Sequence, residues 1–308
     1  PEDIFIWKSD DPNNADYGVV IGYKKNVDNY TILRFPSRCT KVTSKRDIYT
    51  SGVYDDTEDD AATIRSYTKN ILKVELPDTV KELGEEAFSG DCEYGSFNFS
   101  SLERIELSKN ISKIEDSTFK LCNNLKYVKM PDNITEIGME AFSGCGALES
   151  ITIPEGVKKI GNGCFENCTN LQQINLPEGL ETIDSWAFFA CKNLQKINLP
   201  EGLKKIGGVC FEYCTSLQQI NLPEGLESIG SSAFDSTNNL SEIIIPESVK
   251  TIGEYAFDDW TEKQTIKCKA TKAGDNWDKY WNYNYAYTAS NATKISANII
   301  WGYQDNNT

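Results

Sequence analysis

The amino-acid sequence predicts an α/β repeat fold, a solenoid whose short strands stack side by side into a parallel sheet. Two observations support this prediction. Seven blocks of 23 residues follow one another without a gap from Leu102 to Glu262. Within each block, position 1 is always Leu, position 13 is always Ile and position 18 is always Phe. Each block therefore specifies one structural unit, which we call a coil.

The residues at the start of each block predict a strand followed by a turn. Positions 1, 4 and 6 are apolar, as in Leu171, Ile174 and Leu176, and a polar residue lies between positions 4 and 6. This is the pattern of a short strand with one buried face. Position 7 is Pro in six of the seven blocks, and Pro ends the strand because it has no backbone N–H to donate. Gly or Asn at position 9 in most blocks then predicts a turn with positive φ.

A second extended stretch follows, with positions 10 and 13 pointing inward, as in Leu180 and Ile183. Gly at position 14 in most blocks begins a tight turn that carries the Phe of position 18. A period of about 20–29 residues opened by Leu-x-x-Ile-x-Leu is typical of a leucine-rich-repeat solenoid. We therefore expect a parallel sheet with one strand per 23-residue coil. A single coil cannot bury enough apolar surface to fold alone, so the coils must stack and both ends need caps.

The repeat divides the chain into three parts of one continuous solenoid domain. Residues 71–262 hold eight leucine-rich repeats, the first with an eight-residue insert. Residues 263–308 are predicted to form an aromatic-rich C-terminal cap. Residues 1–70 are predicted to form an N-terminal cap with an acidic insert and a degenerate first repeat, whose matching positions are Tyr30, Leu33, Phe35, Pro36, Cys39 and Val42.

Composition excludes several classes of function. The net charge is −15 and no basic stretch stands out, which argues against nucleic acid and against anionic membrane surfaces as partners. The chain has no His, so His-based catalytic triads and His-ligated metal sites are excluded. No apolar run is long enough to cross a bilayer, so we expect no membrane insertion within this chain. No signal peptide is found, and we expect a leader or anchor that was removed from the sequence.

The two inserts each have two interpretations. The acidic insert carries five carboxylates between Asp55 and Asp60, which form either a Ca²⁺ site or a solvated loop. We favour the loop because the spacing of an EF-hand is absent. The eight-residue insert holds Tyr94, Phe97 and Phe99, which form either a binding knob or a segment folded back over the solenoid, the interpretation that we favour.

The C-terminal segment concentrates aromatic residues, with eight Trp and Tyr side chains from Trp277 to Tyr303. If they are exposed, they can stack on sugar rings, so this segment is a candidate glycan-binding site. An open solenoid end also needs a large apolar plug, and aromatic side chains bury about 150–250 Å² each. We favour the cap.

The cysteines form a regular series that predicts packing. Two neighbouring coils hold parallel Cβ vectors about 4.8 Å apart, which is longer than a disulfide allows. The series is a line without Cys-x-x-Cys, so a tetrahedral metal site is also excluded, and we expect no metal and no cofactor. Whether Cys39, Cys92 or Cys268 form disulfides stays open. The residues at position 21 are Cys122, Cys145, Cys168, Cys191 and Cys214, which we interpret as small buried hydrophobic side chains.

The pattern L-x-x-I-x-L-P-E-G-L-x-x-I-G-x-x-A-F-x-x-C resembles the BspA-like, or treponemal-type, leucine-rich repeats. The resemblance is strong over residues 71–262 and weaker toward both ends. It implies a secreted or cell-surface protein of the kind found in oral and gut bacteria and in some mucosal protists. Some relatives are adhesins that bind host matrix proteins or other cells. The family brings no catalytic residues, so we expect no enzyme, and the departures are the two inserts and Thr237 and Trp260 at the end of the Cys series.

We therefore expect a non-enzymatic, extracellular or cell-surface protein that mediates adhesion or protein–protein binding through the outward face of its sheet. The expected partner is a surface protein or matrix component of a host or neighbouring cell, or a glycan, and the chain is expected to be a monomer. Tyr127 is the only aromatic residue in this set, and we expect ligand contacts near Tyr127 and Gln173. The outward residues at positions 3 and 5 are Tyr127, Lys129, Gln173, Asn175, Lys196, Asn198, Gln219 and Asn221.

Two alternatives remain for this set and for the chain. The Asn and Gln side chains of neighbouring coils can bond to each other and serve stability alone. The chain can also be a structural spacer or an assembly subunit that holds other modules away from a surface.

Overall fold

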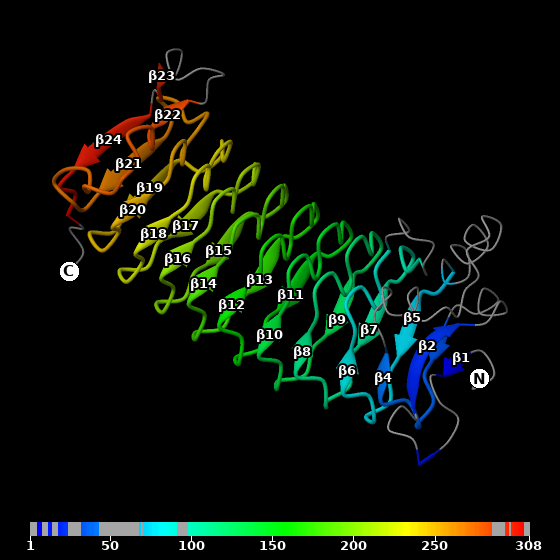
Figure 1. The fold of residues 1–308 in the computed structure, drawn as a ribbon. Coiled ribbons are helices and arrows are strands. Elements are labelled where there is room, and N and C mark those ends of the chain that lie inside the picture. Colours follow the sequence, from blue (N-terminus) through cyan, green and yellow to red (C-terminus); the bar gives the residue numbers. More distant parts are fainter. Residues whose placement is uncertain are drawn as a thin grey trace. The chain divides into compact units, whose positions relative to one another are not determined.

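The structure is a computed structural model that describes residues 5–7, 12–13, 18–23, 32–42, 68, 70–90, 98–284, 293–295 and 297–304. The chain divides into two compact units, residues 1–156 and residues 157–308, which we describe separately. Strands of neighbouring coils pair in parallel within each unit, which confirms the predicted repeat solenoid (Figure 1). The acidic insert, Tyr94 and Phe97 lie outside the described residues.

The first unit contains a sheet of order β3-β5-β7-β9, a sheet of order β1-β2-β4-β6, and the parallel pair β8–β10. Only β1 and β2 are antiparallel in this unit, among the pairs that the described residues form. Its strands are β1 (Phe5–Trp7), β2 (Val19–Tyr23), β3 (Ile32–Arg34), β4 (Lys41–Val42), β5 (Lys73–Glu75), β6 (Glu82–Leu83), β7 (Arg104–Glu106), β8 (Lys113–Ile114), β9 (Tyr127–Lys129), β10 (Glu136–Ile137) and β11 (Ser150–Thr152).

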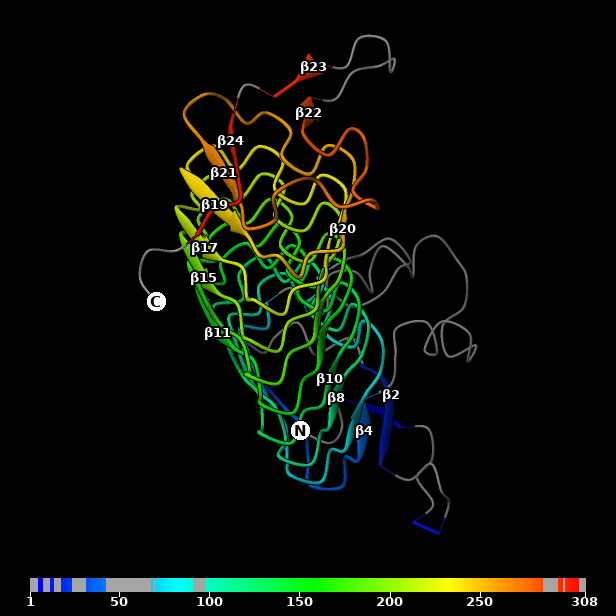
Figure 2. The same ribbon diagram turned by 90° about the vertical axis from the view of Figure 1, so that its left-hand side faces the viewer.

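The second unit contains three parallel sheets, β12-β14-β16-β18-β20, β15-β17 and β19-β21-β24, and the antiparallel pair β22–β23. Figure 2 shows β15, β17 and β19 on one side of the coils and β20 on another. Its strands are β12 (Lys159–Ile160), β13 (Gln173–Asn175), β14 (Thr182–Ile183), β15 (Lys196–Asn198), β16 (Lys205–Ile206), β17 (Gln219–Asn221), β18 (Ser228–Ile229), β19 (Glu242–Ile245), β20 (Thr251–Ile252), β21 (Thr265–Cys268), β22 (Tyr283–Asn284), β23 (Thr293–Lys294) and β24 (Asn298–Trp301).

Each coil has two strands, where the sequence predicted one. In the coil that starts at Leu171, β13 covers positions 3–5 and β14 covers positions 12–13. The predicted second extended stretch therefore pairs as well, with Ile183 opposite both Ile160 and Ile206. No helix occurs in the described part of the chain, so the helical half of the α/β prediction has no counterpart there. The rest of each coil consists of turns.

The Gly residues at position 9 do not have the positive φ that the sequence predicted. The backbone is not left-handed at any of three such residues, Gly179, Gly202 and Gly225. The amide of Leu180 donates a hydrogen bond to the carbonyl of Pro177 at 3.1 Å, which closes the Pro-Glu-Gly turn. A type I turn closed in this way accepts most residues. The turn itself was predicted, but the reason given for its Gly was wrong.

Positive φ occurs at positions 16 and 20 of the coils, mostly on residues other than Gly. Trp186 has φ 63° and Ala190 has φ 55° in the coil that starts at Leu171. The amide of Trp186 donates to the carbonyl of Gly208 at 2.9 Å, and the amide of Ala190 donates to that of Glu212 at 2.8 Å. These bonds to the next coil replace the bonds that a helix would make within the coil. The third side of each coil is therefore a series of turns tied to its neighbour.

The Phe residues of position 18 form the centre of the core. Phe188 is fully buried, and its ring lies parallel to those of Phe165 and Phe211 at centroid distances of 5.6 and 5.4 Å. The same stacking continues to Phe234 at 5.5 Å and to Phe257 at 5.7 Å. Stacked rings in adjacent coils explain why a single residue type occupies this position.

The cysteines at position 21 are buried and unbridged in the described residues, as the sequence predicted. Their thiols also donate hydrogen bonds: Cys191 Sγ lies 3.2 Å from the carbonyl oxygen of Phe165 in the preceding coil. Trp260 replaces Cys in the last coil, and its Nε1 lies 3.0 Å from the equivalent carbonyl of Phe234. Burial raises the pKa of the Cys214 thiol, so the thiol stays protonated and unreactive. Position 21 therefore favours a side chain that donates a hydrogen bond to a buried carbonyl of the preceding coil. The donor is the thiol of Cys191 in one coil and the indole N–H of Trp260 in the last.

We expect Cys191→Ala to lower the free energy of unfolding by about 1 kcal/mol, because a small buried group and one weak hydrogen bond are lost. A reducing agent should leave the melting temperature of the native chain unchanged, since Cys39 and Cys268 are also free thiols. Thermal unfolding followed by circular dichroism with and without reductant measures both effects. A fall of many degrees on reduction would contradict this account.

At the N-terminal end, β3 and β4 pair in parallel with β5 and β6, and Leu33 and Val42 lie opposite Val74 and Leu83. The antiparallel hairpin of β1 and β2 extends the second of these sheets, and the repeat pattern did not predict it. Phe99, from the second insert, is fully buried with its ring edge-on to Phe88 at 5.3 Å. This position agrees with the folded-back interpretation of that residue.

At the C-terminal end, β24 pairs in parallel with β21, with Ile299 opposite Ile266. Trp277 and Trp281 are buried, and the ring of Trp281 lies edge-on to Phe257 at 5.9 Å. Trp281 therefore covers the last ring of the Phe stack, which is what a cap requires. Tyr285 and Tyr287 lie outside the described residues.

Candidate binding face

The face formed by positions 3 and 5 is the candidate binding surface. In β13, β15 and β17 these positions are exposed while the residue between them is buried. In the second unit Lys196 lies opposite Gln219, and Asn198 lies opposite Asn221. The residues of the predicted set that lie on this face of the second unit are Gln173, Asn175, Lys196, Asn198, Gln219 and Asn221.

Tyr127 and Lys129 belong to β9 in the first unit. The guanidinium of Arg104 lies over the Tyr127 ring, 4.1 Å from its centroid, and also pairs with Glu106 at 2.7 Å. Lys129 lies 3.8 Å from the same carboxylate. The hydrogen bond from Arg104 lowers the pKa of Glu106. Tyr127 is thus 40% exposed but already has a cation on one face of its ring.

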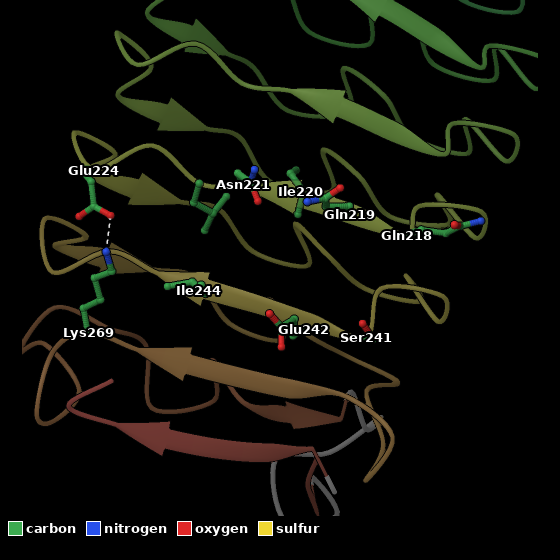
Figure 3. Close-up of a pocket in the computed structure, with 10 residues that line it drawn as sticks. Gln218, Gln219, Ile220, Asn221, Glu224, Ser241, Glu242, Ile244 and Lys269 are labelled. Carbon is green, nitrogen blue, oxygen red and sulfur yellow. Dashed lines mark hydrogen bonds and ion pairs between the residues drawn. The ribbon is translucent and has the colours of Figure 1, made fainter. Parts of the chain in front are cut away.

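A pocket of about 560 Å³ lies over β17 and β19 in the second unit (Figure 3). These two neighbouring strands belong to different sheets. The apolar side chain of Ile244, from β19, lies among polar groups in this pocket. The lining residues are Gln218, Gln219, Ile220, Asn221, Leu222, Glu224, Ser241, Glu242, Ile244 and Lys269.

Two ion pairs lie along the pocket. Lys269 reaches back past β19 to Glu224, with 2.6 Å between nitrogen and oxygen, and forms one end of the pocket (Figure 3). Glu242 pairs with Lys267 at 2.8 Å, and this hydrogen bond raises the pKa of Lys267. Lys267 also lies 4.7 Å from the centroid of the Tyr303 ring. The pocket therefore offers amides that donate and accept, the partly exposed side chain of Ile244 beside the buried Ile220 and Leu222, and two carboxylates that are each paired with a lysine.

The structure brings Gln219 and Asn221 of the predicted set into this pocket, and not Gln173, Asn175, Lys196 or Asn198. Sequence reasoning missed Glu224 and Lys269. One signal was present, because Lys269 occupies position 7, which is Pro in most coils. With an N–H restored, Lys269 donates to the carbonyl of Ile245 at 3.0 Å and continues the strand pairing.

Within the described residues, no group of three or more Cys, Asp or Glu is arranged to hold a metal ion. The same part of the chain contains no helix with the length and apolar character needed to cross a membrane.

The stacked parallel strands, the Phe series and the exposed polar face define a leucine-rich-repeat solenoid protein. The family model described as "BspA type Leucine rich repeat region (6 copies)" matches residues 64–100, 91–207, 135–263 and 183–304. The chain belongs to this BspA-type family, as the repeat pattern predicted.

Solved structures with similar folds come from several bacteria. A leucine-rich repeat protein from Bacteroides ovatus is 26% identical with a TM-score of 0.70, and the match covers 90% of this chain and 66% of that one. A leucine rich cell surface protein from Faecalibacterium prausnitzii is 24% identical with a TM-score of 0.56, covering 89% of this chain and 75% of that one. A T. pallidum leucine-rich repeat protein is 24% identical with a TM-score of 0.52, covering 70% and 89%. The search of curated proteins gave no significant match.

Proposed function

We propose that this chain is a non-enzymatic, secreted or cell-surface protein that binds another protein through the sheet face of residues 157–308. The observation that carries the proposal is the pocket over β17 and β19, where the amides of Gln219 and Asn221 lie on one strand and the aliphatic side chain of Ile244 on the next. Membership of the BspA-type family supports it, as does the similar fold of a protein described as a cell surface protein in Faecalibacterium prausnitzii.

The chemistry of the pocket favours a protein ligand. Gln219 and Asn221 each present both donors and acceptors, which match the main-chain groups of a partner. Ile244 provides apolar contact for one side chain of that partner. The lining contains no aromatic residue, and a pocket for sugar rings would be expected to supply one for stacking. A loop of a surface or matrix protein fits these groups.

The test uses the labelled chain on an array of purified extracellular-matrix proteins and on a glycan array. We expect binding to one or more matrix proteins and a loss of affinity of at least about tenfold for Asn221→Ala with Ile244→Ala, because these residues lie at the centre of the contact. Ser228→Ala with Thr251→Ala is the matched control. It alters the other sheet of the same two coils, through β18 and β20, and should bind like the native chain.

Three outcomes would contradict the proposal. The pocket variant binds as tightly as the control, or Tyr127→Ala alone removes binding, or the chain binds only glycans. A chain that binds neither array would favour the spacer role.

A further inference from the structure

A second exposed surface lies on the turn side of the coils, away from the sheet face. Trp186 and Tyr213 are 41% and 44% exposed, and Phe189 lies between them with its ring 5.0 Å from Trp186 and 5.7 Å from Tyr213. These residues occupy positions 16, 19 and 20 of two successive coils. Large exposed aromatic groups with no place in the core commonly mark interaction sites.

The stability of the fold does not explain these rings. Positions 16 and 20 have positive φ, which is costly for large side chains and easy for Gly or Asn. In the coil before Trp186, the same two positions hold Gly163 and Asn167, with φ 58° and 56°. Trp186 and Tyr213 adopt φ 63° and 58° and remain exposed. Their rings are therefore available for a contact outside the chain.

Acidic residues neighbour Tyr213 in the chain and in the next coil, since Glu212 precedes it and the amide of Tyr213 donates to the carbonyl of Asp235 at 3.2 Å. Glu212, Asp235 and Asp258 occupy position 19 in three successive coils, and Asp259 follows at position 20. The hydroxyl of Ser236 lies 2.8 Å from Asp235 Oδ1 and 3.0 Å from Asp259 Oδ2. One hydroxyl has one proton to donate, so it cannot satisfy both oxygens at once. Negative charge is in excess here.

Three of these carboxylates, those of Glu212, Asp235 and Asp259, have no balancing cation among the residues that the structure describes. No ion pair joins Glu212, Asp235 or Asp259 to a lysine or arginine in the described part of the chain, although exposed carboxylates elsewhere are often paired. Burial raises the pKa of Glu212 to about 7, with Asp235 and Asp258 adding to the rise. Burial also raises the pKa of Asp235 to about 6. The negative charge of Glu212 and Asp235 also raises the pKa of Tyr213.

The first unit shows how such a group is completed. There, Tyr127 has the Arg104 guanidinium 4.1 Å from its ring centroid, and Glu106 pairs with the same guanidinium at 2.7 Å. The Arg104 guanidinium therefore contacts both the Tyr127 ring and the Glu106 carboxylate within the chain. Around Tyr213 the ring and the carboxylates are present, and the arginine is not supplied by any described residue of the second unit.

We propose that Trp186, Phe189, Tyr213, Glu212, Asp235 and Asp259 form an aromatic–acidic patch that binds an arginine-rich segment of a partner protein. A guanidinium is planar, stacks on aromatic rings and pairs with carboxylates at the same time. A neutral sugar would use the rings and leave the carboxylates repelling one another. The patch is separate from the sheet face, so this inference does not depend on the proposed function.

Fluorescence anisotropy with a labelled peptide of alternating Arg and Gly tests the patch at low ionic strength. We expect saturable binding that weakens with salt. Trp186→Ala with Tyr213→Ala should weaken it about tenfold, since cation–π contacts are lost. Glu212→Gln with Asp235→Asn should have a similar effect.

The matched control is Glu178→Gln with Glu201→Gln, which removes the same number of charges from the exposed Pro-Glu-Gly turns of the same unit. It should change the affinity less than about twofold, because exposed charges at a distance contribute little. Equal losses in the control and in the patch variants would overturn the proposal, since binding would then follow net charge alone. Non-saturable binding, or displacement of the peptide by a neutral oligosaccharide, would overturn it as well.

Discussion

Phe188→Ala is expected to lower the free energy of unfolding by about 3–5 kcal/mol, the usual cost of removing a fully buried ring. The Phe188 ring is in stacking contact with rings in the coils on both sides, Phe165 at 5.6 Å and Phe211 at 5.4 Å. Alanine leaves a cavity between two coils that neither coil can close alone. Because each coil is stabilised by its neighbours, the loss weakens pairing on both sides.

Phe189→Ala provides the control, since it removes the same atoms from the next residue in the chain. Phe189 is only partly buried and touches the exposed rings of Trp186 and Tyr213. We expect its substitution to cost about 1 kcal/mol. Urea unfolding followed by far-UV circular dichroism compares the two variants. Similar midpoints for both would show that the Phe series does not hold the coils together.

The inward side chains of the coil could be predicted from the sequence because their spacing is fixed by the chain itself. Period-two alternation places Ile174 inward in a strand, and the 23-residue repeat places each Phe above the previous one. The left-handed backbone at Trp186 and Tyr213 could not be predicted in the same way. It results from hydrogen bonds to the next coil, and those override the preference of a large residue for negative φ.

Each candidate site likewise has one part that the sequence could predict and one part that it could not. The exposure of Gln219 and Asn221 follows from alternation along one strand. The pocket around them depends on Glu224 and Lys269, which are 45 residues apart and meet only when coils stack. The Arg104–Tyr127 contact joins equivalent positions of neighbouring coils, so the stacking register predicts it once the register is known. Contacts between coils can be predicted only when the register in which the coils stack is known. The repeat pattern also does not show how far a side chain extends toward the neighbouring coils.

A second large effect is expected at position 14, where Gly is needed for close approach between coils. A Cβ added at Gly207 would overlap the amide nitrogen of Ser185 and the carbonyl carbon of Asp184 in the preceding coil. The sequence pattern agrees with this constraint. Residues other than Gly occupy position 14 only at Glu115 and Asp184, and each has Gly at the same position in the coils before and after it.

Gly207→Ala should therefore lower the free energy of unfolding by about 2–3 kcal/mol, because the methyl group meets backbone atoms that cannot rotate away. Gly202→Ala, five residues earlier in the same coil, is the control. Its added Cβ would lie 3.3 Å from the nearest atom, the carbonyl oxygen of Glu178, and its φ is not in the left-handed region. We expect Gly202→Ala to change the free energy of unfolding by less than about 1 kcal/mol, because the small shift required of the Glu178 carbonyl offsets the restriction of the unfolded chain. Urea midpoints that are lowered equally by both substitutions would show that Gly207 serves turn geometry and not the contact between coils.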